Sequence, residues 1–311
     1  MGPLRSQRVV GWGAPREVTS LPDVIGVFGP TASGKSAVSE ALATRLGTEV
    51  VSADALQVYR GLPILTNQPQ SPTRLVAITD LSNEMSVGSY AVLAHGAVDE
   101  LVQAKGIAVV TGGTGLYFRA ALVDLGVPGP SPAETRARVE ASYDSDPAAT
   151  YARLAKLDAP AANVVHPNDR RRVVRALELA ESGGSLVPEQ DRLWSEEVRR
   201  PTLVVGLELS RGVLEARIRT RTQDMFRRGV VEEVRRARAG HVSRVAEKAL
   251  GLADIAALSP EEAFERIVVR TRRYAAYQRK WMRRIPGIVM IDGDRTPTEV
   301  ADAILEVAGA R

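Results

Sequence analysis

Cysteine is absent from the 311-residue sequence, and there are only three histidines. The chain can therefore form no disulfide and no thiolate metal site, and the scattered histidines do not supply the ligands of a zinc site. Apolar runs are no longer than a strand, whereas a bilayer-crossing helix needs about 20 apolar residues. Residues 1–21 also lack the continuous apolar core of a secretory signal. We therefore expect a cytoplasmic protein that has no contact with membranes. We also expect a monomer, although these absences do not bear on the oligomeric state.

Hydrophobic residues make up 44% of the chain and charged residues 25%, as in ordinary globular proteins. Positive charge is distributed unevenly. Residues 1–150 contain 11 Lys/Arg and 14 Asp/Glu, whereas residues 151–311 contain 30 and 23, a net charge of +7. This excess in the second half favours a polyanionic partner.

Short apolar runs at residues 23–28, 49–52, 75–79, 107–111, 202–209 and 288–291 predict strands, and helix-length segments separate most of them. This alternation predicts an α/β fold with a P-loop NTPase-like parallel sheet and helices on both faces. Between residues 123 and 200 the strand signal disappears, and helical patterns occur at 133–143, 147–157 and 169–181. We expect a flexible N-terminal extension at 1–21, a core formed by 22–122 and 201–311, and an all-helical insertion at 123–200.

The clearest motif follows the first predicted strand, where residues 29–36 match G-x-x-x-x-G-K-S. In this geometry backbone N–H groups and the helix N-terminus form an anion cradle. Lys35 adds a positive charge, and Ser36 can ligate Mg²⁺ bound to the phosphate groups. We therefore expect a ligand with a diphosphate group to bind the motif, which consists of Gly29, Pro30, Thr31, Ala32, Ser33, Gly34, Lys35 and Ser36.

The motif alone leaves the type of enzyme open. Kinases and NTPases usually place a metal-holding Asp at the end of a second apolar strand. Here the strand at 107–111 leads instead into a glycine turn at residues 112–115, at the sheet edge where ligands bind. The carboxylate near the phosphate site is Asp54, which follows the strand at 49–52.

Several segments together resemble the tRNA dimethylallyltransferase family, also called tRNA isopentenyltransferases. They occur in the family's order and extend over nearly the whole chain. One departure is Gln68, which stands where the family usually has a lysine. The matching segments are the P-loop, Ser52-Ala-Asp-Ala-Leu-Gln-Val-Tyr-Arg-Gly61, Gly112-Gly-Thr-Gly-Leu-Tyr-Phe118, His166-Pro-Asn-Asp-Arg-Arg-Arg-Val-Val-Arg-Ala-Leu-Glu178, Ala249-Leu-Gly251 and Thr271-Arg-Arg-Tyr-Ala-Ala-Tyr-Gln-Arg-Lys-Trp281.

The resemblance implies transfer of a dimethylallyl group from dimethylallyl diphosphate to the N6 amine of adenosine-37, just 3′ of the anticodon in tRNA. It implies that Asp54 is the general base and that the P-loop clamps the leaving diphosphate with Mg²⁺ as cofactor. Thr114, Lys35 and Arg217 are the other catalytic residues that we expect. Arg221 lies four residues after Arg217 on the same expected helix face, and we assign it to the diphosphate.

Basic helices predict the tRNA-binding surface. Residues 266–284 contain eight Lys/Arg and no acid, with three aromatic residues interleaved. Positive charge supplies affinity for RNA, and aromatic planes can stack on unpaired bases. By resemblance we expect the anticodon stem-loop to contact Asp54, Ala55, Leu56, Gln57, Arg136, Arg171, Arg172, Val173, Val174, Arg175, Arg273, Tyr277 and Lys280.

Three alternatives compete with this interpretation. An adenylate prenyltransferase would share the P-loop and the aspartate, but such enzymes typically lack the helical insertion. A small-molecule P-loop kinase would leave the basic second half unexplained. A non-catalytic RNA-binding module would not need the intact P-loop beside Asp54.

Overall fold

The computed structural model describes residues 21–129, 131–187 and 192–309. At its centre is a six-stranded, all-parallel sheet in the order β3-β2-β4-β1-β5-β6. The strands are β1 (Val24–Phe28), β2 (Val50–Ser52), β3 (Thr73–Arg74), β4 (Ala108–Gly112), β5 (Thr202–Glu208) and β6 (Val289–Asp292). The predicted α/β class with a parallel sheet is confirmed. The extension expected at residues 1–21 lies, apart from Leu21, outside the described residues.

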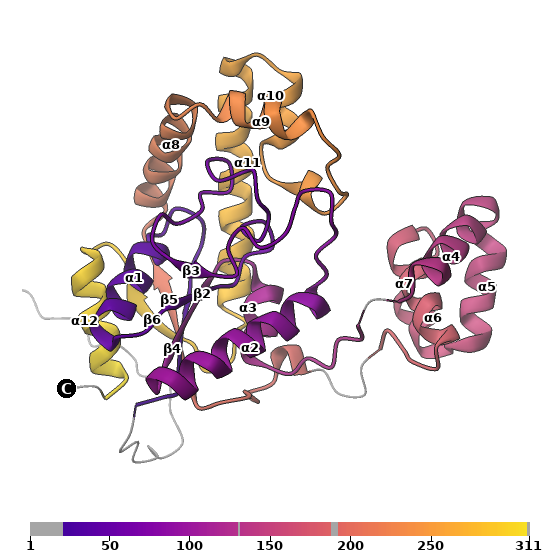
Figure 1. The fold of residues 1–311 in the computed structure, drawn as a ribbon, viewed down its shortest axis with the longest axis horizontal. Coiled ribbons are helices and arrows are strands. Elements are labelled where there is room, and N and C mark those ends of the chain that lie inside the picture. Colours follow the sequence, from indigo (N-terminus) through magenta and orange to yellow (C-terminus); the bar gives the residue numbers. More distant parts are fainter. Residues whose placement is uncertain (1–20, 130, 188–191, 310–311) are drawn as a thin grey trace, which may run out of the picture.

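Helices cover both faces of the sheet, because successive side chains of a strand point to opposite sides. On one face Ile25 and Val27 pack in the core with α1 (Lys35–Leu46) and α12 (Pro297–Val307). On the other face Val24 and Phe28 pack with α2 (Val87–Lys105) and α3 (Gly115–Leu122). Figure 1 shows α1 beside α12, and α2 beside α3. Because β1 is buried along its whole length, the start of the loop that follows it is firmly fixed.

The strand predicted at residues 75–79 is wrong. Leu75 and Ala77 have φ angles of 63° and 52°, and this left-handed backbone interrupts an extended strand. Parallel pairing with β2 ends at Arg74, and beyond it an isolated bridge joins Tyr59 to Thr79. The segment between β2 and β3 forms turns rather than a connecting helix.

Four helices after α3 form a cluster with its own core: α4 (Ala133–Ser145), α5 (Pro147–Leu157), α6 (Ala159–Val164) and α7 (Arg170–Glu181). The core of this cluster includes Val139, Leu154 and Leu177. Figure 1 shows the cluster standing apart from the sheet. The helices predicted at 133–143, 147–157 and 169–181 are confirmed, whereas α6 is too short for its periodicity to be recognised. The boundaries of the insertion at 123 and 200 stay a prediction.

The two chain segments that lead to and from this cluster meet where they leave the core. The Arg199 N–H donates a hydrogen bond to the Leu122 carbonyl at 2.9 Å. The returning segment contains the 3-10 turn η1 (Arg192–Trp194), and the buried Arg119 of α3 donates to three backbone carbonyls of residues 192–195. Arg119 therefore fixes the returning segment to the core.

The chain after β5 is mostly helical, as expected. It forms α8 (Arg211–Arg227), α9 (Val230–Arg238), the 3-10 turn η2 (Ala246–Lys248), α10 (Leu252–Ala257) and α11 (Pro260–Met282). α11 begins with a capping box in which Ser259 and Glu262 exchange hydrogen bonds. In Figure 1 it runs from the region of α9 and α10 down to the sheet. In the part of the chain that is described, no helix has the length and apolarity needed to span a bilayer.

Candidate active site

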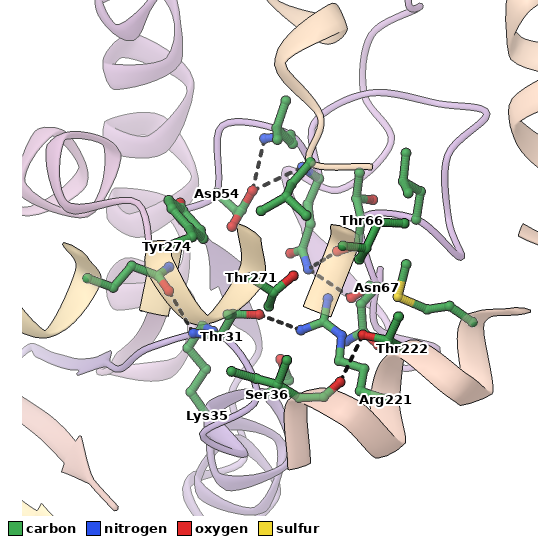
Figure 2. Close-up of a pocket in the computed structure, with 18 of the residues that line it drawn as sticks. Thr31, Lys35, Ser36, Asp54, Thr66, Asn67, Arg221, Thr222, Thr271 and Tyr274 are labelled. Carbon is green, nitrogen blue, oxygen red and sulfur yellow. Dashed lines mark hydrogen bonds between the residues drawn. The ribbon is translucent and has the colours of Figure 1, made fainter. Parts of the chain in front are cut away.

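A cavity of about 110 Å³ lies at the carboxyl edge of the parallel sheet. Its walls come from the P-loop, the segment after β2, the end of β4, α8 and α11. Figure 2 shows Lys35, Asp54, Arg221 and Tyr274 around it, each from a different element. This is the edge at which open α/β sheets bind their ligands.

The P-loop has the strand–loop–helix geometry that its sequence predicts. Gly34 caps α1 with a φ of 90°, and no side chain caps the first turn of the helix. The N-terminal N–H groups of α1 therefore stay available to an anion. Thr31, Lys35 and Ser36 line the cavity, whereas Ser33 is buried, and its hydroxyl has no hydrogen-bond partner among the described residues. Gly29, Pro30 and Ala32 complete the loop without lining the cavity.

The pKa of Lys35 is strongly perturbed. The pKa of its ammonium is lowered to about 8: desolvation has the largest effect, the negative charge of Asp54 opposes it, and the positive charge of Arg221 adds to the lowering. Its Nζ donates to the Pro30 carbonyl at 3.4 Å. This ammonium is partly buried and forms no ion pair among the described residues, so a bound diphosphate would provide the counter-ion that it lacks there.

Asp54 follows β2 and reaches the cavity with one oxygen already fixed. Its Oδ1 accepts hydrogen bonds from the backbone N–H groups of Leu56 at 2.9 Å and Gln57 at 3.3 Å. These bonds hold the carboxylate in one orientation, and in the described part of the chain Oδ2 accepts none. Asp54 therefore both caps its own turn and presents a free oxygen to the cavity, as a general base requires. Ala55 and Leu56 follow it, and Leu56 lines the cavity.

Gln57 supports a neighbouring loop. Its Oε1 accepts from the Ser52 hydroxyl at 2.9 Å, and its Nε2 donates to the carbonyls of Thr66 and Asn67 at 3.3 and 2.9 Å. The amide of Gln57, which the family resemblance places in contact with the tRNA, is thus already hydrogen-bonded within the chain. Gln68 holds the same loop by donating to two backbone carbonyls.

The two arginines expected to bind the diphosphate occupy different places. Arg221 is partly buried, lines the cavity and donates to the Thr31 hydroxyl at 2.6 Å; desolvation lowers its pKa, against the opposing charge of Asp54. Arg217 does not line the cavity. It lies behind the P-loop, where it donates to the Ser33 carbonyl at 3.5 Å and pairs with Asp294 at 3.1 Å. A direct contact of Arg217 with the reacting atoms is therefore not supported by its position.

α11 contributes three side chains that sequence reasoning did not assign to the catalytic site. Thr271, Tyr274 and Gln278 all line the cavity, and their spacing places them on one helix face. Burial, followed by the charge of Asp54, raises the pKa of Tyr274 to about 12, and hydrogen bonds with Thr114 and Gln278 act in the opposite direction. The helical spacing of these polar residues within a basic helix is the signal that could have revealed them.

Two glycines of the turn after β4 allow side chains of α11 to approach closely. A Cβ at Gly113 would lie 2.5 Å from the Gln278 side chain, and one at Gly115 would lie 2.1 Å from the Trp281 ring. Only residues without a side chain permit this close approach. Thr114, expected to be catalytic, caps α3 outside the cavity lining and contacts the Tyr274 hydroxyl. Its position supports an indirect role, through Tyr274.

One wall of the cavity is apolar. This wall consists of the side chains of six residues from the loop segments, α8 and α11: Leu56, Leu65, Ile218, Met225, Leu250 and Ile267. Apolar and phosphate-binding surfaces therefore face the same small volume. Such a cavity suits a ligand with a diphosphate at one end and a hydrocarbon group at the other.

The arginines of the insertion divide into two groups. Arg136 pairs with Glu84 at 3.1 Å, and Arg175 donates to backbone carbonyls of the segment that leads into α4. Both are thus engaged within the chain. Arg171 and Arg172 are exposed and form no ion pair among the described residues. They are the cations of α7 most accessible to a phosphate.

The other residues expected to bind tRNA differ in exposure. Val173 and Val174 are buried in the core of the insertion, so their side chains are not available as RNA contacts. Arg273, Tyr277 and Lys280 are exposed on the outer face of α11. Trp281 is partly buried instead, with its ring centroid 4.6 Å from that of Trp194. The exposed face of α11 is therefore basic and carries one accessible aromatic ring.

Fold and site together define a P-loop α/β protein whose phosphate cradle opens onto an apolar wall and an oriented carboxylate. A family model described as IPP transferase matches residues 57–285, and one described as isopentenyl transferase matches residues 22–74. The first match covers well over half of the chain. The chain belongs to the IPP transferase family.

Individual relatives agree with this assignment. A tRNA dimethylallyltransferase of Kineococcus radiotolerans is 38% identical over 311 residues, covering 91% of this chain and 96% of its own. The crystal structure of the tRNA isopentenylpyrophosphate transferase of Bacillus halodurans matches with a TM-score of 0.64 and 29% identity, over 92% of this chain and 97% of that one. A eukaryotic dimethylallyltransferase crystallised while acting on tRNA matches with a TM-score of 0.73 and 25% identity, over 93% and 80%.

Proposed function

We propose that the protein transfers the dimethylallyl group of dimethylallyl diphosphate to the N6 amine of adenosine-37 in tRNA. The observation that carries this proposal is the cavity itself, which places the P-loop, the free Oδ2 of Asp54 and the apolar wall around one volume. The names of the relatives, which are tRNA-modifying prenyltransferases, support it. The protein would act in the cytoplasm as a monomer.

In the proposed reaction a bond forms between N6 of adenine and C1 of the prenyl group, while the bond from C1 to the diphosphate oxygen breaks. The N6 lone pair is delocalised into the ring, so the amine is a weak nucleophile and needs a base. Asp54 takes the N6 proton through its free oxygen. Lys35 and Arg221 stabilise the negative charge that develops on the leaving diphosphate, and low water access strengthens both interactions.

The donors at the phosphate end fit Mg²⁺. The Ser36 hydroxyl lines the cavity and offers an oxygen ligand. No cluster of three or more His, Cys, Asp or Glu occurs in the described ranges, which suits an ion that keeps its waters and is held largely by substrate phosphates. When bound, Mg²⁺ would neutralise charge on the diphosphate, and Ser36 would hold it.

The acceptor base must leave its stack to reach Asp54. An anticodon loop makes this inexpensive, because unstacking an unpaired base costs at most a few kcal/mol. The exposed cations of α7 and α11, together with the Tyr277 ring, would hold the surrounding RNA backbone and bases.

The alternatives are less consistent with the site. A kinase needs room and polar contacts for a nucleoside, whereas six of the residues that line the cavity are apolar. β4 ends in glycine and provides no metal-holding acid. An adenylate prenyltransferase would not require the helical cluster with its exposed arginines.

The decisive experiment is a transfer assay with labelled dimethylallyl diphosphate, Mg²⁺ and unmodified tRNA, with AMP and ATP as competing acceptors. The informative variant is Asp54→Asn, because an asparagine oxygen can still cap the N–H groups of Leu56 and Gln57. We expect label in tRNA only, and a fall in kcat of about 10²- to 10⁴-fold in the variant.

Asp302→Asn, on the exposed surface of α12, is the matched control and should retain wild-type rates. Label in AMP would instead make the protein an adenylate prenyltransferase. ATP turnover without any transfer of label would refute the prenyltransferase proposal. Wild-type rates in Asp54→Asn would show that another group accepts the proton.

A further inference from the structure

Gln278 occupies an unusual position between the P-loop and the glycine turn. It is 2% exposed, and it is one of the few polar side chains that the core encloses. Its Oε1 accepts a hydrogen bond from the Thr31 N–H at 2.7 Å, and its Nε2 donates to the Gly113 carbonyl at 2.8 Å. The two ends of one amide thus connect two loops that follow different strands.

The partner on the P-loop side is itself a cavity residue. While Gln278 holds the Thr31 N–H, Arg221 holds the Thr31 hydroxyl at 2.6 Å. Thr31 is therefore fixed through both its backbone and its side chain (Figure 2). The same hydrogen bond orients the Arg221 guanidinium. Among the described residues, the other hydrogen bonds from the P-loop to distant segments join Gly29 to Gly112 at 3.4 Å and Ser33 to Arg217 at 3.5 Å. Both are longer than the two contacts of Thr31, so the shape of the loop depends most on this pair.

The Gly113 side shows that the contact is built into the fold. A Cβ at Gly113 would approach the Gln278 Nε2 to 2.5 Å and the Gly29 carbonyl to 2.9 Å. The turn, the first residue of the P-loop and the Gln278 amide therefore pack against each other directly. A change in the amide is transmitted to both loops at once.

We propose that Gln278 is a positioning residue for the prenyl donor: it holds the P-loop in the shape that binds the diphosphate by tying Thr31 to the turn at Gly113. This inference rests on the proposed function for the identity of the donor, but its physical claim concerns diphosphate binding alone. Removing the amide leaves a backbone N–H and a carbonyl without partners, and the loop moves to find others. Productive geometry tolerates little such movement.

Two variants distinguish the hydrogen bonds of the Gln278 amide from the volume that its side chain fills in the core. Gln278→Met keeps the volume and removes both hydrogen bonds. Gln278→Glu restores both when the carboxyl is protonated, because a COOH group can accept from Thr31 and donate to Gly113. Ionisation of that carboxyl removes the donor and adds a negative charge beside the diphosphate. Met282→Ala, one turn further along α11 and also buried, controls for loss of stability by cavity formation.

The measurements are the Kd of inorganic diphosphate with Mg²⁺ by calorimetry, the KM of dimethylallyl diphosphate, kcat and the thermal midpoint. For Gln278→Met we expect Kd and KM to rise about tenfold, the loss expected for two hydrogen bonds to backbone groups. For Gln278→Glu the quantity of interest is the ratio of its Kd to the wild-type Kd at the same pH. We expect this ratio to be near one at acid pH and to rise as the pH increases. Met282→Ala should lower the midpoint and leave Kd unchanged.

Wild-type Kd values in Gln278→Met, or a pH-independent ratio in Gln278→Glu, would overturn the inference. Failure of the wild type to transfer label to tRNA, with the Kd effects intact, would refute the proposed function and leave the role of Gln278 standing.

Discussion

Lys35 combines two properties that act against each other at the level of a single residue. The ammonium must be charged to bind a diphosphate, yet it is partly buried at a place where the charged form is disfavoured. Its pKa of about 8 places its titration just above neutral pH. The empty cradle is therefore sensitive to alkali, and a bound diphosphate raises the pKa again because its negative charge favours the ammonium.

The donor affinity should accordingly depend on pH. Because the pKa in the folded protein is below the ordinary 10.5, the charge is present below pH 8 and is lost as the pH rises through that value. Above pH 8 we expect kcat/KM for dimethylallyl diphosphate to fall about tenfold per pH unit, with a much flatter kcat at saturating donor. Steady-state kinetics between pH 6.5 and about 9.5 would measure both.

Lys35→Arg provides the control, since a guanidinium stays charged over this range. Its kcat/KM should be lower at neutral pH but should not decline above pH 8. A wild-type profile that stays level up to about pH 9.5 would contradict the assignment of Lys35 as the titrating group.

Residue types in the P-loop and after β2 predict the chemical groups of the site well, because these side chains follow strand ends that the apolar pattern already indicates. Long-range partners are different. Neither the contact of Gln278 with Thr31 nor the pairing of Arg217 with Asp294 follows from local spacing. Each depends on how α11 and α8 dock on the sheet.

At the scale of elements, the junction of α3 and α11 depends on a missing side chain. Gly115→Ala would place a Cβ 2.1 Å from the Trp281 ring, which cannot move freely because it packs on Trp194. We expect a loss of about 1–3 kcal/mol in the free energy of unfolding, as for other overpacked contacts. Denaturant unfolding would measure it.

Gly212→Ala is the matched control, because Gly212 also lies at the start of a helix and has open space around it. This variant should be neutral or slightly stabilising, by up to about 1 kcal/mol. Equal stability of the two variants would mean that Trp281 yields without cost.

Sequence analysis predicted correctly the helices that are long enough to show a repeating apolar pattern. Helices of eleven or more residues in the insertion were recognised, since three turns reveal an apolar stripe. The six-residue α6 was missed, and the strand at 75–79 was wrong because backbone angles at Leu75 and Ala77 left no trace in composition.

At the scale of the whole molecule, positive charge is presented by two separate bodies, α7 of the insertion and α11 of the core. Arg172 has no ion-pair partner among the residues described, so it can bind an RNA phosphate without first breaking an ion pair within the protein. Arg172→Gln should weaken tRNA binding and reduce the slope of log Kd against log salt by about 0.7–1. Binding titrations at several salt concentrations would show this.

Arg45→Gln offers the comparison, because Arg45 lies on α1, beside α12 and away from the insertion, where it pairs with Asp302. We expect its salt slope to equal that of the wild type. Equal slopes for all three proteins would exclude Arg172 from the RNA interface.

The meeting of the two connecting segments at Leu122 and Arg199 has an evolutionary consequence. An insertion whose ends touch can be gained, lost or exchanged in one genetic event without rethreading the sheet. Every residue that lines the cavity lies outside the segment 123–200. The residues that line the cavity and the exposed arginines of α7 therefore lie on separable stretches of the sequence, and each stretch can change at its own rate.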